Sequence, residues 1–316
     1  MERITCIFCG ITSNHIAITE NGYNGLKCAN CNLIYISPRP GAAEITQIYT
    51  DYHAVQYADA HFQFEGFGRK VAARTLSKIK NYRKSGSILE LGPGGGYFLL
   101  EALHYGYEPY GIELNPIEAR WINEKLYIPC ETTALSKSSF GERKFDIIYH
   151  NDVLSHLYDP VGVFREINQS MKKTGLLVFE TGNIADVNEK HYKWFSEFHY
   201  PEHLFYFGEK SLGILLERTG FKCLQVYRDA ILLPLLLQKL LWRMKDPLKD
   251  KKTVEDMRSK KDLNPVGRAQ LGMKRRLRRT YRYAMHNLTK FGSILLPKNG
   301  WPLKLLVIAE KRSDLK

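Results

Sequence analysis

A glycine-rich turn between an apolar run and an amphipathic run constrains the fold of this chain more than any other feature. Residues 87–91 read Ser-Ile-Leu-Glu-Leu, residues 92–96 read Gly-Pro-Gly-Gly-Gly, and apolar residues then recur with helical spacing from Tyr97 to Tyr105. This order predicts a buried parallel strand, a tight turn and a helix. The turn of such a unit lets a ligand approach the backbone, so the sequence predicts an α/β fold with a ligand site at the turn.

The residues around the turn narrow the ligand class. A P-loop requires Lys-Ser/Thr after its glycines, which this chain lacks. The dinucleotide fingerprint requires a small residue three positions after its second glycine, where this chain has Tyr97 or Leu99, and this disfavours a pyrophosphate. Glu90, just before the turn, suits a ligand with a positive group. Glu113 ends a second predicted strand and suits a ribose diol.

Several stretches, in order, resemble the motifs of class I S-adenosylmethionine-dependent methyltransferases. They are LELGPGGGYFL, GIELNP, KFDIIYHNDVLSHLYDP (144–160), GLLVFET (175–181) and PEHLFYFGEKSLGILLERTGF (201–221). The resemblance covers roughly residues 50–230 and a last strand near 303–310. An N-terminal ribbon ending in ISPRP is similar to that of bacterial members that methylate sugars or natural-product intermediates. The resemblance implies a Rossmann-like, seven-stranded, mostly parallel sheet with helices on both faces.

The resemblance also implies how S-adenosylmethionine is bound. Glu90 is expected to face the methionine amino group, and Glu113 to hold the ribose hydroxyls. Further cofactor contacts are expected in the glycine turn and after the second, third and fourth strands, at Gly92, Gly94, Gly96, Leu114, Thr133, Ala134, His150, Asn151 and Asp152. The family usually has an acidic residue near the adenine amino group, where this chain has Thr133 and Ala134. The adenine contacts therefore depart from the family pattern.

Methyl transfer needs few catalytic groups, because the sulfonium already makes the methyl group electrophilic. The enzyme must align the acceptor with the S–CH3 axis and exclude water. A hydroxyl or carbon nucleophile can also need a base. The candidates, with His203 first, are His203, His199, His156, Tyr200 and Glu202. Each also has a structural interpretation, as an exposed side chain or one bonded to a backbone carbonyl.

Two cysteine pairs near the N-terminus have the spacing of a four-thiolate zinc site. They are Cys6-x2-Cys9 and Cys28-x2-Cys31, with 18 residues between the pairs. The alternative is two disulfides, which the reducing cytosol disfavours in a chain without a secretion signal. Four sulfur ligands leave no open position, so we expect a structural metal rather than a catalytic one. Residues 1–45 hold three basic groups and no basic face, which argues against nucleic-acid binding.

The formal net charge of +13 is concentrated in one segment. Between Ile231 and Gly300 there are 18 Lys/Arg and 5 Asp/Glu, so this segment alone carries the whole excess. It also contains a leucine-rich stretch and an amphipathic stripe, and two interpretations remain open. The segment docks on an anionic membrane, or its helices cover the substrate site. The first residues show no apolar signal core, so we expect a cytoplasmic protein, with peripheral contact at the inner membrane face under the first interpretation.

These observations divide the chain into four parts. They are a zinc ribbon at 1–45, a helical cover or linker at 46–85, a methyltransferase core at 86–230 plus 301–316, and a basic helical insertion at 231–300. The predicted activity is methyl transfer to oxygen or carbon of a small-molecule, sugar or lipid-linked acceptor. A nicotinamide-dependent oxidoreductase and a non-catalytic zinc-containing binding module are the alternatives.

Overall fold

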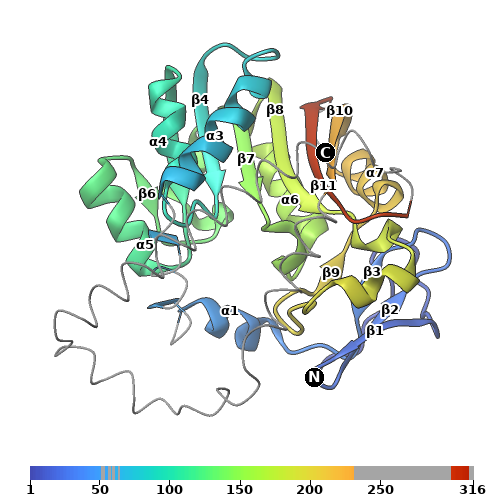
Figure 1. Cartoon of the computed structure of the whole chain (residues 1–316). Helices are drawn as coiled ribbons and strands as arrows, with labels where there is room; N and C mark the ends of the chain where they lie inside the picture. Colours follow the sequence, from blue (N-terminus) through green and yellow to red (C-terminus); the bar gives the residue numbers. More distant parts are fainter. Residues whose placement is uncertain (51–53, 56–57, 59–60, 63–64, 231–299, 313–316) are drawn as a thin grey trace, which may run out of the picture.

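The computed structural model describes residues 1–50, 54–55, 58, 61–62, 65–230 and 300–312 (Figure 1). These residues form a seven-stranded sheet, a four-stranded sheet and helices around both. The predicted insertion at 231–300 lies almost wholly outside the described residues, as does part of the predicted cover at 46–85. Among the described residues, no helix has the length and apolar character to cross a membrane.

The large sheet has the strand order β10-β11-β8-β7-β4-β5-β6. Its strands are β4 (Gly86–Leu91), β5 (Tyr107–Ile112), β6 (Cys130–Glu131), β7 (Phe145–Asn151), β8 (Met171–Gly182), β10 (Phe221–Ala230) and β11 (Leu303–Lys311). The strands from β6 to β8 pair in parallel, whereas β11 runs antiparallel to both β8 and β10. The sequence order reverses beside β4, and the carboxyl ends of strands at such a switch point form a ligand crevice. The predicted fold class is confirmed.

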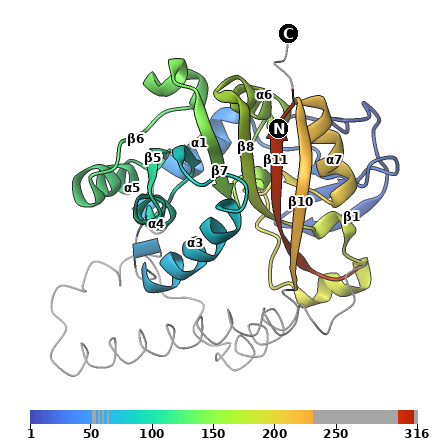
Figure 2. The same ribbon diagram turned by 90° about the horizontal axis from the view of Figure 1, so that it is seen from above.

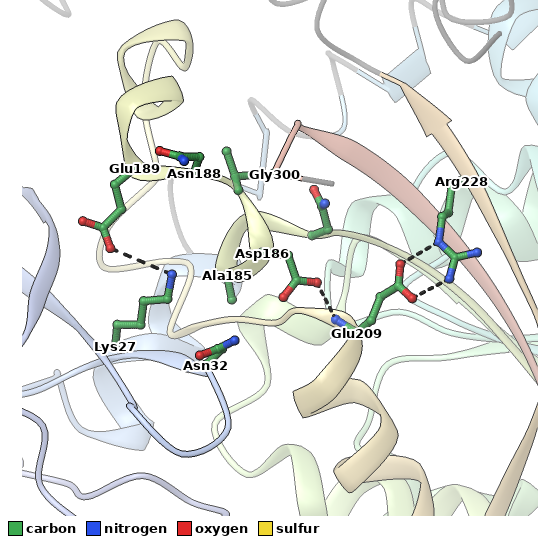
Figure 3. A pocket seen from close by; sticks show the side chains of 11 residues that line it. Lys27, Asn32, Ala185, Asp186, Asn188, Glu189, Glu209, Arg228 and Gly300 are labelled. Atoms are coloured by element: carbon green, nitrogen blue, oxygen red, sulfur yellow. Dashed lines mark hydrogen bonds and ion pairs between the residues drawn. The ribbon is translucent and has the colours of Figure 1, made fainter. Parts of the chain in front are cut away.

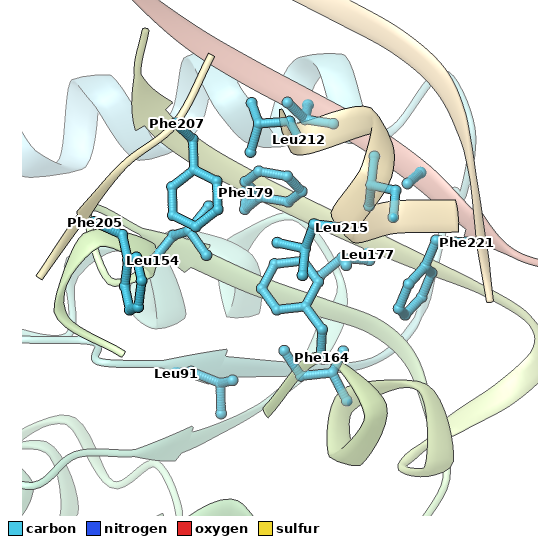
Figure 4. Close-up of a cluster of buried hydrophobic side chains, with 14 of the residues drawn as sticks. Leu91, Leu154, Phe164, Leu177, Phe179, Phe205, Phe207, Leu212, Leu215 and Phe221 are labelled. Carbon is cyan, nitrogen blue, oxygen red and sulfur yellow. The ribbon is translucent and has the colours of Figure 1, made fainter. Parts of the chain in front are cut away.

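Helices cover the sheet on both faces (Figure 2). The helices are α1 (Ala42–Thr50), α3 (Glu65–Ile79), α4 (Tyr97–His104), α5 (Pro116–Trp121), α6 (Pro160–Gln169) and α7 (Glu209–Arg218). One buried cluster joins α3 and α4 to sheet residues such as Ile88 and Ile147. On the other face, α6 and α7 bury Phe164 and Leu215 against Phe179 (Figure 4). Each fully buried side chain of this size contributes about 1.5–3 kcal/mol of transfer free energy, so both helix layers stabilise the sheet.

The ribbon forms its own sheet, and a strand from the core completes it. Its order is β1 (Ile16–Glu20), β2 (Tyr23–Lys27), β3 (Ile34–Ile36) and β9 (Phe205–Tyr206), all antiparallel. The ribbon is also continuous with the core of the molecule, because Leu33 and Tyr35 belong to the same buried cluster as Phe205 and Leu212. The ribbon is therefore packed against the segment that follows β8.

Candidate functional site

The glycine turn between β4 and α4 has a backbone that side chains would disrupt. Gly92, Gly94 and Gly96 have φ values of 68°, 53° and 75°, in the left-handed region. A Cβ on Gly92 would lie 2.8 Å from Val153 Cγ2, and one on Gly96 would lie 2.7 Å from Leu126 Cδ1. Both the conformation and the space therefore require glycine here. The turn lies at the carboxyl end of β4, where the fold places its ligand crevice.

Glu113 braces this turn from the end of β5. Its Oε2 accepts a hydrogen bond from Gly94 N at 2.9 Å, and its Oε1 accepts one from Asn115 N at 2.9 Å. The side chain is 8% exposed, and burial raises the pKa of its carboxyl, while the two amide bonds act in the opposite direction. A carboxylate oxygen can accept more than one hydrogen bond, so this group can brace the turn and also receive hydroxyls.

Glu90 is a buried carboxyl group with an unsatisfied oxygen. It is 4% exposed, and its Oε2 has no hydrogen-bond partner among the residues that the structure describes. Burial raises its pKa well above the ordinary value, and the nearby carboxylates of Glu113 and Glu180 act in the same direction. A buried, unpartnered carboxyl needs a compensating donor, and a cation satisfies it best. The residues present therefore fit a ligand with an ammonium group beside the glycine turn.

A network that the sequence analysis missed surrounds the ends of β7 and β8. Glu180 accepts hydrogen bonds from Thr75 Oγ1 at 2.8 Å and from Tyr149 Oη at 3.0 Å. Lys304 Nζ lies 3.3 Å from Glu180 Oε2, and the positive charge helps to keep the pKa of Glu180 low despite burial. Both residues lie inside strands, and although Glu180 falls in the stretch 175–181 that resembles a family motif, no local pattern marks its pairing with Lys304. The network balances one of the carboxylates that face Glu90.

The three residues predicted at the end of β7 do not all lie on one face. Asn151 Oδ1 accepts from Lys304 Nζ at 2.8 Å, and Asp152, with a φ of 54°, lies 3.2 Å from the same nitrogen. His150 instead packs in the core, with its ring stacked on Phe179 at 5.1 Å between centroids. Burial lowers the pKa of His150 to about 3, and neither ring nitrogen has a partner among the described residues.

The residues predicted on the adenine side lie in surface segments. Leu114 is 42% exposed directly after Glu113. Thr133 and Ala134 follow the short strand β6, where Thr133 is half-buried and Ala134 is exposed. These three positions border the carboxyl ends of β5 and β6, and none of them carries an acidic side chain.

The predicted catalytic histidines gather in one cluster. The ring centroid of His203 lies 4.4 Å from that of His156 and 5.2 Å from that of His199. His156 ends the short helix η4 (Leu154–His156) after β7. Burial lowers the pKa of its ring, and the carboxylates of Glu202 and Asp152 only partly oppose this. The structure therefore brings together segments separated by more than 40 residues in sequence.

The hydrogen bonds around His203 assign its tautomer. The Tyr206 hydroxyl donates to the Phe198 carbonyl, and His203 Nδ1 lies 3.2 Å from the same hydroxyl oxygen. Because the tyrosine proton is already donated, Nδ1 must carry the hydrogen, which leaves the lone pair on Nε2. Burial, followed by the neighbouring histidines, lowers the pKa of His203 to about 2, so the ring is neutral. His203 has the protonation state of a proton acceptor.

Tyr200, unlike the histidines, packs its side chain against the ribbon. Its side chain is 2% exposed and belongs to the cluster formed with Ile18, Ile34 and Ile36 of the ribbon. Its hydroxyl oxygen has no hydrogen-bond partner among the described residues. Glu202 lies between Tyr200 and His203 in the same segment, and its carboxylate is close enough to His156 to raise the pKa of that ring.

The four predicted cysteine ligands converge. The Sγ atoms of Cys6, Cys9, Cys28 and Cys31 all lie within 4.8 Å of one another, and none of these cysteines is in a disulfide. Sulfur atoms around a tetrahedral zinc with bonds of about 2.3 Å lie roughly 3.8 Å apart, so the cluster has the dimensions of such a site. Tight turns present both pairs, with Gly10 N donating to Cys6 O and Asn32 N donating to Cys28 O. The residues present fit zinc.

A separate polar cavity of about 840 Å³ lies between the ribbon and the core (Figure 3). Its lining consists of Lys27, Asn32, Asn183, Ala185, Asp186, Val187, Asn188, Glu189, Glu209, Arg228 and Gly300. Arg228 is paired with Glu209, and Glu209 N donates to Asp186 at 2.7 Å. The lining contains none of the predicted cofactor or catalytic residues.

Comparisons with known proteins agree with this geometry. Residues 60–226, more than half of the chain, match the family described as a methyltransferase domain. A curated relative, the tRNA U34 carboxymethyltransferase of Aliarcobacter butzleri (strain RM4018), is 26% identical over 177 residues, which cover 52% of this chain and 56% of the relative. This chain thus matches about half the length of that relative.

A solved structure, the 1,6-didemethyltoxoflavin-N1-methyltransferase of Burkholderia thailandensis, was determined with S-adenosylhomocysteine bound. It has a TM-score of 0.52 and 14% identity over 94% of this chain and 98% of its own. At this identity the likeness concerns the fold. With the strand order and the glycine turn, the family match leads to one conclusion: this chain belongs to the methyltransferase-domain family.

Proposed function

We propose that this enzyme methylates a small-molecule, sugar or lipid-linked acceptor at an oxygen or carbon whose proton His203 removes. The observation that carries the proposal is the tautomer of His203, which directs its lone pair to Nε2. His156 and His199 surround it, and Asp152 at the end of β7 links this cluster to the ligand crevice of the sheet. The electrostatic interaction between Asp152 and His156 supports a position of the histidine segment on the acceptor side.

The cofactor side of the proposal rests on Glu90 and Glu113. When bound, S-adenosylmethionine supplies a methyl group activated by its sulfonium. Glu90 would pair with the ammonium of the methionine moiety, and this pairing satisfies the buried Oε2 atom. The glycine turn would let the ligand approach the backbone, and Glu113 would accept bonds from the ribose hydroxyls while it continues to brace Gly94.

The lowered pKa of His203 keeps its ring neutral. A neutral imidazole can accept a proton, so His203 can act as a base in methyl transfer. This protonation state suits a hydroxyl acceptor as well as a carbon next to a carbonyl, so both stay within the proposed acceptor class.

A tRNA acceptor is the second candidate, because the curated relative is a tRNA U34 carboxymethyltransferase. The described ribbon offers little electrostatic support, since Arg39 is buried and Lys27 lies 3.9 Å from Glu189. Nucleic-acid binding normally needs a basic surface. The basic segment at 231–300 lies outside the described residues apart from Gly300, and its predicted contact with membrane or substrate stays a prediction.

The remaining parts of the proposal concern the division of the chain. Residues 1–45 would bind one structural zinc through the four cysteines, and residues 86–230 with 301–316 would carry the cofactor site. The segment 46–85 would cover this site, since Asn115 Nδ2 donates to Ala54 O at 2.8 Å next to Glu113.

Transfer of a labelled methyl group from S-adenosylmethionine tests the proposal. Separate reactions would contain keto-sugars and nucleotide sugars, lipid-linked sugars, and bulk tRNA. We expect label in a small-molecule, sugar or lipid-linked acceptor, and its loss in the His203→Ala variant. Label in tRNA alone would overturn the proposed acceptor class, and full activity of His203→Ala would overturn the role of His203.

A further inference from the structure

The tip of the ribbon's first hairpin forms hydrogen bonds with the backbone beside the histidine cluster. Glu20, the last residue of β1, accepts a hydrogen bond from Phe198 N through Oε1 at 2.7 Å and from Tyr200 N through Oε2 at 2.7 Å. The next residue, Asn21, donates from Nδ2 to Tyr200 O at 2.7 Å. A single ribbon carboxylate thus binds two amides that lie 178 and 180 residues away in sequence. Charge-assisted bonds of this length are among the stronger hydrogen bonds in proteins.

His199, which lies between the two amides that Glu20 binds, has an unfavourable backbone conformation. His199 has a φ of 60°, in the left-handed region that non-glycine residues rarely adopt. Such a conformation persists only where its surroundings fix it, and Glu20 fixes the amide on each side. The carbonyl of His199 then accepts a hydrogen bond from His203 N at 3.0 Å. The conformation held by Glu20 therefore sets the turn that presents His203.

The ribbon also pairs with the other end of the histidine segment, at β9. Ile34 of β3 pairs with Tyr206 of β9, and Tyr206 is the residue whose hydroxyl fixes the tautomer of His203. Between these points the Tyr200 ring lies on Gly25 of β2, where a Cβ would come within 2.0 Å of the tyrosine Oη. His203 is thus held between two attachments to the ribbon, one at residues 198–200 and one at Tyr206.

We propose that Glu20 is a positioning residue for methyl transfer, and that the ribbon forms part of the acceptor side of the site. The carboxylate fixes the turn at residues 198–200, the turn fixes His203 through its backbone amide, and the strand pairing of β9 fixes Tyr206. This inference rests on the proposed role of His203 as the proton acceptor. It gives the ribbon a function beyond metal binding, because its hairpin tip determines where the proton acceptor lies.

The test compares Glu20→Gln with a matched control in the full chain. Glutamine keeps the size of the side chain but replaces one accepting oxygen with a donor that faces an amide N–H. The control is Glu44→Gln, since Glu44 also accepts from a backbone amide, Gly41 N at 2.7 Å, but contacts no residue of the histidine segment in the described structure. Glu20→Asp, which keeps the charge on a shorter stem, is the second variant and serves if Glu20→Gln fails to fold.

Histidine-selective 15N NMR and amide exchange of the S-adenosylhomocysteine-loaded protein provide the readouts. For Glu20→Gln we expect exchange at Phe198 and Tyr200 to be roughly tenfold faster or more, and the His203 ring signals to shift or broaden. The affinity for S-adenosylhomocysteine should stay within about twofold, since Glu20 lies in the ribbon. Glu20→Asp should show a smaller change of the same kind, and Glu44→Gln should show none.

Unchanged His203 signals in Glu20→Gln would overturn the positioning role, even if the two amides exchange faster. Equal changes in Glu44→Gln would overturn it as well, because the effect would then be general. A failure of the proposed function has a different signature. In that case the wild-type protein would show the His203 proton on Nε2, or the His203→Ala variant would keep full activity, and neither result depends on the residue at position 20.

Discussion

Replacing Glu90 with glutamine should have opposite effects on stability and on cofactor binding. In the ligand-free protein this carboxyl is 4% exposed, its Oε2 has no partner among the described residues, and two other carboxylates lie close to it. Its pKa is therefore raised above the value in the unfolded chain. For an acid, a raised folded-state pKa means that stability is lost as the pH rises from the unfolded pKa toward the folded one. A neutral amide removes this loss.

The size of both effects follows from the burial of the group. A buried polar group left unsatisfied costs about 1–3 kcal/mol, and part of this is recovered by an amide that can donate to a neighbouring carboxylate. Each kcal/mol raises the midpoint of a chain with 150–250 folded residues by roughly 2–4 °C. The lost ion pair with an ammonium should weaken S-adenosylhomocysteine binding by about 1.5–3 kcal/mol, or roughly 10- to 150-fold.

Scanning calorimetry of the ligand-free protein at pH 8 and titration calorimetry with S-adenosylhomocysteine measure the two effects. Glu108→Gln is the control, because Glu108 is an exposed carboxylate on β5, and it should change neither quantity by much. We also expect the wild-type affinity to rise with pH, since ammonium binding favours the ionised carboxylate. A Glu90→Gln protein that is less stable than the wild type and binds the ligand equally well would refute the reasoning.

Three further predictions follow from the same structure. Glu113→Gln should weaken S-adenosylhomocysteine binding by roughly 1–3 kcal/mol in a calorimetric titration, because one bond to the ribose or to the Gly94 amide is lost, and unchanged affinity would remove Glu113 from the site. Metal analysis should find about one zinc per chain, and Cys28→Ser should lose this zinc and lower the melting temperature; a fully folded, active metal-free protein would contradict this. If residues 231–300 dock on a membrane, vesicle sedimentation should show binding to anionic vesicles at low salt that weakens at high salt. Protein that stays in the supernatant would instead favour the interpretation of this segment as a substrate cap.

The sequence predicts the local parts of this site well. The strand at β4, the glycine turn and the start of α4 at Tyr97 agree with the structure because an apolar run and a glycine-rich turn act over a few residues. The cysteine pairs likewise converge, since their spacing sets two turns that must face one another. Such features depend on short-range geometry, which the order of residues specifies directly.

The features that sequence analysis missed depend on pairing between distant segments. The strand β9 has only two residues, and its pairing with β3 joins positions more than 160 residues apart, which no local pattern encodes. Lys304 reaches Glu180 and Asn151 because β11 inserts beside β8, a consequence of the whole sheet order. The position of His150 follows from strand alternation, because the pairing of Glu90 with Tyr149 places the next residue on the opposite face.

The central claim is that the crevice beside Glu90 and the glycine turn binds S-adenosylmethionine, and titration calorimetry of the wild-type protein tests it most directly. The protein is titrated with S-adenosylhomocysteine and, separately, with NADH. We predict saturable binding of S-adenosylhomocysteine at about one site per chain, in keeping with the single glycine turn among the described strand–helix units, and no heat of binding with NADH. Saturable NADH binding without S-adenosylhomocysteine binding would contradict the account and restore the oxidoreductase alternative.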